Sequence, residues 1–182
     1  MREKGLYIGD LVLGANDGII TTFAVISGAA GAGLSAFVII VLGLANLVAD
    51  GISMGLSNYL SLRSTKAFQE KESLTFPASE SKIIEGIFGH PLRHGLATGL
   101  AFAFAGALPL IPYFFDIPQN LQFYIAMAAT AAALFTVGAL RTLVTDAHWI
   151  RSGLEMLVVG GIAAIAAYVV GAIVKALFGA AI

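Results

Sequence analysis

Five long runs of apolar residues, separated by shorter polar stretches, dominate the pattern of the chain. A helix needs about 20 mostly apolar residues to cross the hydrocarbon core of a bilayer, and each run is long enough. The pattern therefore predicts an all-α integral membrane protein with a single transmembrane domain of five helices. The predicted spans are residues 9–30, 36–60, 94–114, 121–143 and 153–178.

Glycine and alanine are abundant within the predicted spans, and several glycines recur at a spacing of four residues. Small residues at this spacing let two membrane helices pack with their backbones close together. Two of the pairs bracket Asp17 and Met54, so we expect them to bring the first two helices together at those positions. The pairs are Gly14 with Gly18, Gly51 with Gly55, and Gly95 with Gly99.

The composition agrees with a membrane protein and excludes several other classes. Of the 182 residues, 58% are hydrophobic and only 12% are charged, and the mean hydropathy is +0.90. A soluble domain carries about 25% charged residues. Cysteine is absent, which excludes disulfides, thiolate metal sites and cysteine nucleophiles. The net charge of −1 creates no field that would attract nucleic acid, so we expect no nucleic-acid partner.

The basic residues predict the orientation, because loops rich in lysine and arginine stay in the cytoplasm. All but Lys175 of the ten basic residues precede the first span, lie between the second and third, or flank the turn between the fourth and fifth. We therefore expect a cytoplasmic N-terminus and an external C-terminus. Residues 61–93 form the longest polar stretch and would be a short cytoplasmic loop.

Polar side chains with ligand chemistry interrupt the first two predicted spans. Asp17 lies in the first, while Asn46, Asp50 and Met54 recur every four residues in the second and form a stripe along that helix. An ionisable group costs about 3 kcal/mol or more at the bilayer centre and usually marks a conduction or relay site. We interpret these four residues as candidate ligands for a cation that crosses the membrane. Carboxylates suit hard ions and thioethers softer ones, so the mixed set favours Fe(II), or else Mn, Co or Zn.

The two stretches GANDGIITTFAVISGAAGAG and LANLVADGISMGLSNYLSLRS resemble the first two helices of the vacuolar iron transporter family. The likeness continues in HGLATGLAFAFAGALPLIPYF and RSGLEMLVVGGIAAIAAYVVG, so it covers nearly the whole chain. The resemblance implies a homodimer of five-helix subunits that exports Fe(II) or Mn(II) from the cytosol, typically in exchange for protons. It also implies a path between the first helices of the two subunits, lined by Asp17 and Met54.

Two features depart from the family pattern. Asn46 stands where the eukaryotic iron carriers have a glutamate, and an amide binds metal without taking up a proton; Asp50 is the candidate replacement. The polar stretch 61–93 is too short for the metal-collecting domain of those carriers and has no methionine, which resembles prokaryotic members and predicts a plasma-membrane location. Its acidic residues would form a solvated loop or contribute weak metal contacts: Glu70, Glu72, Glu80 and Glu85.

Other titratable residues have simpler interpretations. We expect Asp10 to lie at a solvated helix end near the inner interface. His90 and His94 have metal-ligand spacing, but Pro91 is expected to start a helix between them, which favours an interfacial pair over a metal site. Glu155 follows Arg151 by one turn, and the two are expected to pair.

The residues are compatible with three interpretations of the function. We favour a homodimeric transporter, because one subunit supplies too few ligands and two copies of Asp17 and Met54 would supply four. Metal binding requires ionised carboxylates, so metal would displace protons there. The alternatives are a transporter of another cation, and a non-transporting structural or regulatory membrane protein whose acids only hold helices together. We expect no enzyme and no cofactor, because no nucleophile and base occur as a pair within the spans.

Overall fold

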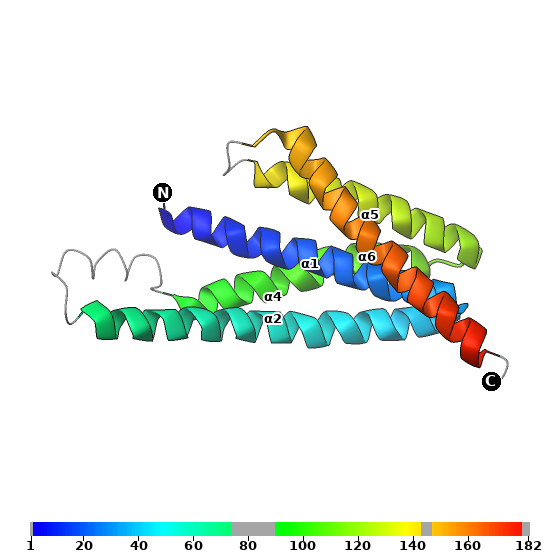
Figure 1. Ribbon diagram of the computed structural model, residues 1–182, viewed down its shortest axis with the longest axis horizontal. Helices are drawn as coiled ribbons and strands as arrows, with labels where there is room; N and C mark the ends of the chain where they lie inside the picture. The colour runs from blue at the N-terminus through cyan, green and yellow to red at the C-terminus, as the bar shows by residue number, and fades with distance from the viewer. Residues whose placement is uncertain (1, 74–89, 143–146, 180–182) are drawn as a thin grey trace.

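The structure is a computed structural model that describes residues 2–73, 90–142 and 147–179, and in these ranges it contains helices and no strands. The N-terminus and the end of the last helix lie at opposite ends of an elongated bundle (Figure 1). The elements are α1 (Arg2–Ala32), α2 (Ala36–Ser73), α4 (Pro91–Ala107), the 3-10 helix η1 (Leu108–Phe114), α5 (Gln119–Arg141) and α6 (Trp149–Phe178).

Within the described ranges, five helical segments are long and apolar enough to cross a membrane, which confirms the predicted all-α membrane protein. The third of them joins α4 to η1, and the α-helix ends there because Pro109 and Pro112 lie within η1. The second helix differs from the expectation for the polar stretch 61–93, because α2 continues as helix to Ser73. A polar helical extension has no hydropathy signal, so the sequence pattern did not predict this part of the helix.

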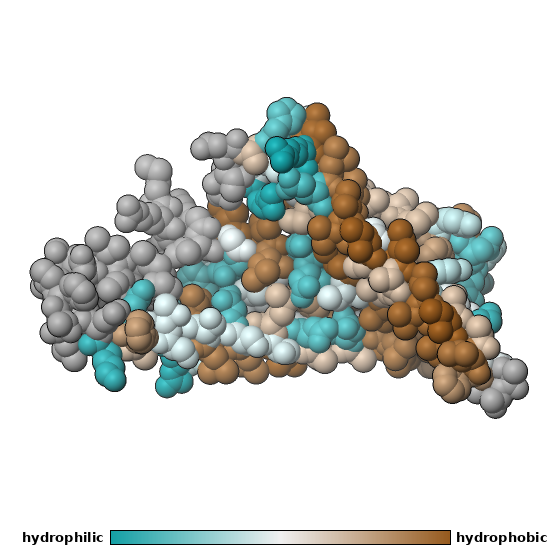
Figure 2. Space-filling view, viewed as in Figure 1, coloured by the Kyte–Doolittle hydropathy of each residue, from teal (hydrophilic) through white to brown (hydrophobic). Residues whose placement is uncertain are grey.

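Helix α1 lies at the centre of the bundle and packs against α4 and α6 along much of its length. Helix α4 packs against both α1 and α2, which also contact each other, while α5 and α6 cover the other side of α1 (Figure 1). Hydrophobic residues run along the outward face of α6 (Figure 2), as expected for a surface that contacts lipid tails.

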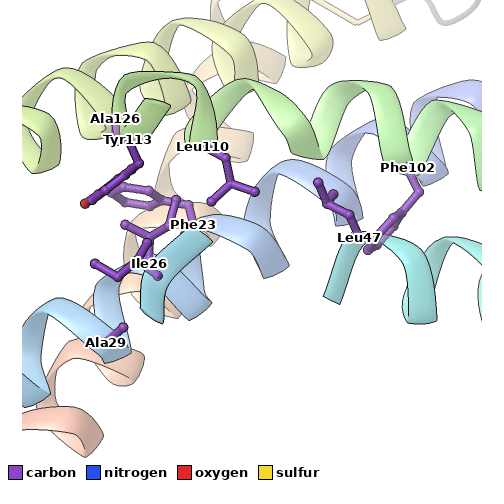
Figure 3. Packing of buried hydrophobic residues seen from close by; sticks show 9 residues of the cluster. Phe23, Ile26, Ala29, Leu47, Phe102, Leu110, Tyr113 and Ala126 are labelled. Carbon is purple, nitrogen blue, oxygen red and sulfur yellow. The ribbon is translucent and has the colours of Figure 1, made fainter. Parts of the chain in front are cut away.

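The largest buried cluster joins residues from α1, α2, α4, η1 and α5 (Figure 3). Phe102 of α4 and Ile26 of α1 are fully buried within it. Side chains from this many elements fix the relative positions of the helices, because a close-packed interior tolerates little rearrangement. The members are Phe23, Ile26, Ala29, Ile39, Leu47, Phe102, Leu110, Tyr113 and Ala126.

The turn between α1 and α2 depends on Gly33. Its φ of 74° lies in the left-handed region that side chains disfavour. The amide of Gly33 donates to the carbonyl of Ala30 and the amide of Leu34 to that of Ala29, both at 2.9 Å. This pair of bonds is the Schellman motif, which ends α1 and returns the chain antiparallel to it.

The glycine pairs produce close helix contacts, but the partner is α4 and not the helix that we expected. A Cβ atom on Gly14 or Gly18 of α1 would overlap backbone atoms of α4. On the opposite side of α4, Gly99 lies so near α2 that its Cβ would be 2.6 Å from the carbonyl oxygen of Gly51. The expectation that these pairs join α1 directly to α2 was wrong. Small residues indicate that a close helix contact exists, but they do not identify the partner helix.

Replacing Gly18 by alanine tests the tight contact between α1 and α4. The added methyl would overlap the carbonyl oxygen of Phe102, and we expect a loss of about 1–3 kcal/mol in the free energy of unfolding. The midpoint of thermal unfolding in detergent would measure it. Gly161→Ala in α6 is the control, because nothing lies within 4 Å of its Cβ position. Equal midpoints for the two variants would contradict the contact.

Candidate functional site

Asp17 lies in the middle of α1, where its side chain is half-buried. The hydroxyl of Thr21 donates to the backbone carbonyl of Asp17 at 2.8 Å, so this hydroxyl is used within the helix. The Asp17 carboxylate itself makes no hydrogen bond within the described part of the chain. An acid at this depth therefore has ligand capacity that the protomer does not satisfy.

The three candidate ligands on α2 are half-buried and one turn apart, as their spacing predicts. The charge of Asp50 on α2 acts on Asp17 on α1, so two acids from different helices interact electrostatically. The thioether side chain of Met54 packs at the edge of the large buried cluster. The side-chain amide nitrogen of Asn46 is buried and has no hydrogen-bond partner among the described residues.

The register between α1 and α2 places all four candidates along one seam. The helices are antiparallel, Asp10 contacts Asn58, and Asp17 lies near Asp50. Because both helices rise by about 1.5 Å per residue, the same register sets Asn46 level with Thr21 and Met54 about one turn from Asp17. The seam therefore offers two carboxylates, an amide and a thioether within a few helical turns.

One protomer does not complete a metal site by itself. Within the described residues, no three side chains of histidine, aspartate or glutamate come close enough to hold an ion together. The acids of the polar stretch add nothing to this count: Glu70 and Glu72 lie in the last part of α2 without described side chains, while Glu80 and Glu85 lie outside the described residues. Their weak metal contacts stay a prediction.

A second polar cluster, which we call the Asp10–His94 cluster, joins α1, α2 and α4 near the end of the bundle that carries the N-terminus. The Asn58 side-chain amide donates to Asp10 Oδ1 at 2.8 Å and to Thr98 Oγ1 at 2.6 Å. Asp10 Oδ2 contacts His94 Nδ1, and the ring of Tyr7 stacks on the imidazole with centroids 4.0 Å apart. His94 is only 2% exposed, so this cluster is a buried network.

The Asp10–His94 cluster corrects two expectations. Asp10 is not at a solvated helix end, because α2 and α4 pack over it and hydrogen-bond its carboxylate. His90 and His94 do not form an interfacial pair, since His90 is exposed while His94 is buried. Pro91 does begin α4 between them, as expected. The sequence did contain a sign that His94 lies on a packed helix face, because His94 and Thr98 are four residues apart beside the packing glycines of α4. This spacing becomes informative only when the partner helices are known.

Ion pairs connect the end of α5 with the start of α6. Arg151 Nε lies 3.3 Å from Glu155 Oε1, which confirms the expected pair one turn apart. Arg141 at the end of α5 reaches the other oxygen of Glu155 at 3.2 Å. Glu155 therefore has a local structural role at the surface.

Together, these features define a multi-pass helical membrane protein with acids and a thioether at the seam between its first two helices. A model of the VIT family matches residues 8–79 and 73–172. This covers most of the chain, which therefore belongs to the VIT family.

Individual relatives have low identity and high coverage. The chain is 26% identical to the vacuolar iron transporter of Toxoplasma gondii, across 96% of this chain and 76% of that protein. It is 24% identical to vacuolar iron transporter 1 of Arabidopsis thaliana, across 94% and 87% of the two chains. It is 28% identical to vacuolar iron transporter homolog 2 of Oryza sativa, across 87% and 86%.

Proposed function

We propose that this protein transports divalent transition-metal ions, Fe(II) or Mn(II), out of the cytosol across the cell membrane in exchange for protons. The observation that supports it best is the pair of carboxylates that Asp17 and Asp50 place near one another at the seam of α1 and α2. Two acids whose charges interact within a membrane protein are costly unless a cation or proton compensates them.

The ligand chemistry and the relatives support the choice of metal. The seam combines hard carboxylate oxygens with the thioether of Met54 one turn along α2, a mixture that suits Fe(II) and other borderline ions. Mg²⁺ and Ca²⁺ prefer oxygen ligands alone. Iron is also the metal in the names of the relatives from Toxoplasma gondii and Arabidopsis thaliana.

A homodimer would complete the metal path. The described part of one protomer holds no group of three acidic or histidine side chains around a common point. If two copies met along the seam of α1 and α2, the two-fold axis would bring together two sets of Asp17, Asp50 and Met54. Such an arrangement would supply the ligands of the ion. It would also place the side-chain amide of Asn46, which has no hydrogen-bond partner among the described residues, in a polar environment.

Proton exchange needs groups that gain and lose protons, and Asn46 is not one. Asp17 and Asp50 would bind metal when ionised and take up a proton when the metal leaves. We assign the next step towards the cytosol to the Asp10–His94 cluster, because Asp10 lies seven residues from Asp17 on the same helix face, about 10 Å away. The groups that face the Asp10–His94 pair are Tyr7, Asn58 and Thr98, so a single proton changes the net charge there.

Replacing Asp17 by asparagine tests the proposed path. The variant keeps the shape of the side chain and removes its charge, so we expect divalent-metal flux into proteoliposomes to fall at least tenfold. A pH-sensitive dye inside the vesicles would report the counterflow of protons. Asp116→Asn, an exposed acid between η1 and α5, is the matched control. Unchanged flux with lowered thermal stability would instead support a protein whose acids only join helices.

Replacing Met54 by leucine tests the identity of the ion. Leucine preserves the volume and apolar packing of the side chain, so stability should change by less than about 1.5 kcal/mol. Because the thioether is lost, we expect Fe(II) flux to fall several-fold and Mn(II) flux to fall less. Competition between the two ions in the same vesicles measures the ratio. A ratio equal to that of the wild type would contradict a ligand role for Met54.

Replacing His94 by glutamine tests the proposed proton step. Glutamine can still hydrogen-bond Asp10 but, unlike an imidazole, it takes up no proton. We expect metal flux to lose at least half of its dependence on pH, while the unfolding midpoint stays within a few degrees. His90→Gln at the exposed start of α4 is the control. A wild-type pH profile in His94→Gln would show that the cluster has a structural role only.

A further inference from the structure

A groove runs along the outer side of the bundle between α2 and α4, with a volume of about 580 Å³. Its floor exists because Gly51, Gly55, Gly95 and Gly99 have no side chains and the two backbones nearly touch there. Apolar side chains rise on both sides of this floor. The walls include Val48, Ile52 and Leu56 from α2 and Leu92, Leu96 and Leu100 from α4.

A second hollow of about 550 Å³ continues the groove at the end of the bundle that we predict to be cytoplasmic. Three basic side chains line it: Arg63, Lys66 and Arg93. Arg63 Nη1 donates to the hydroxyl of Tyr59 at 3.3 Å, which directs the guanidinium to the mouth of the groove. No acidic side chain is among the described residues that line this hollow.

The first turn of α4 adds a further preference for anions. Arg93 lies in this turn, and Pro91 is its first residue. Pro91 has no amide hydrogen and the Arg93 amide donates to the carbonyl of His90 at 3.0 Å, so the preference comes from the helix dipole, which favours negative charge at this end. An anionic group in the hollow would therefore meet positive side chains from two helices as well as the start of α4.

The two hollows share Tyr59 and Leu92, so a charged compartment opens directly into an apolar one. We propose that together they bind one anionic glycerophospholipid of the cytoplasmic leaflet, with its phosphate among Arg63, Lys66 and Arg93 and one acyl chain in the groove. Basic pockets between membrane helices on the cytoplasmic side bind such headgroups.

The dimensions of the groove fit an acyl chain. Its lining on α2 extends from Leu44 to Tyr59, which is about 22 Å along a helix axis and more than the depth of one leaflet, about 15 Å. A free phosphate would use the charged hollow and leave the groove unused. The stripe of Asn46, Asp50 and Met54 lies about 150° around α2 from the centre of the groove, so the lipid and the proposed dimer contact use different faces.

Native mass spectrometry of the purified protein would test the proposal, with phosphatidylglycerol, phosphatidylcholine and inorganic phosphate as separate probes. We expect phosphatidylglycerol to remain bound at least tenfold more than phosphatidylcholine, and to raise the unfolding midpoint by several degrees. The triple variant Arg63→Gln, Lys66→Gln, Arg93→Gln should lose this preference. Lys71→Gln with Arg151→Gln is the control, because these exposed basic residues do not line the hollow.

A second variant keeps the test valid if the triple variant does not fold. Leu96→Trp fills the groove and leaves the basic hollow intact, so it should weaken phosphatidylglycerol binding at least several-fold. Equal binding of the two lipids, or retention of phosphatidylglycerol by both test variants, would overturn the proposal. Equal stabilisation by inorganic phosphate would also overturn it, since that outcome assigns the hollow to a free anion.

Discussion

The close packing of α4 between α1 and α2 is the constraint on which the other features depend. Glycines on all three helices remove the side chains that would separate their backbones. With the helices held at this distance, the register of α1 against α2 sets Asp17 beside Asp50 and Asp10 beside Asn58. The same contact leaves the glycine floor of the groove open on the outer side. One packing arrangement thus produces the seam, the buried cluster and the groove.

The two groups of intramembrane acids differ in how far the protomer satisfies them. Asp10 has partners from α2 and α4, and its network is complete within a single chain. Asp17 and Asp50 have no hydrogen bond to their carboxylates in the described chain, and they repel each other. In a medium without water, a purely structural role accounts only for acids whose hydrogen bonds are satisfied, as in the Asp10–His94 cluster. The unsatisfied pair requires a component from outside the protomer, which is why we assign the cation to it.

The sequence predicted the number of spans and the stripe of Asn46, Asp50 and Met54, because the lipid solvent imposes hydropathy and helical geometry imposes spacing. It did not predict that α4 would separate the glycine pairs of α1 and α2, since contact partners are a tertiary property. His94 was assigned to an interface for the same reason: its burial depends on Tyr7, Asp10 and Asn58 from other helices. The polar end of α2 to Ser73 was missed because it has no apolar run.

The region after α2 bears on how metal would reach the seam. The family match is in two parts that meet at residues 73–79, directly after α2 ends, and the alignment with the Toxoplasma gondii protein extends over 230 positions against 182 residues here. Extra residues at this point in the relatives would explain both observations. We propose that a chain with a short connection here receives metal directly at the end of the bundle that contains Asp10, the end that we predict to be cytoplasmic. The partly buried carboxylate of Asp10 would then be a negative group on the way to Asp17.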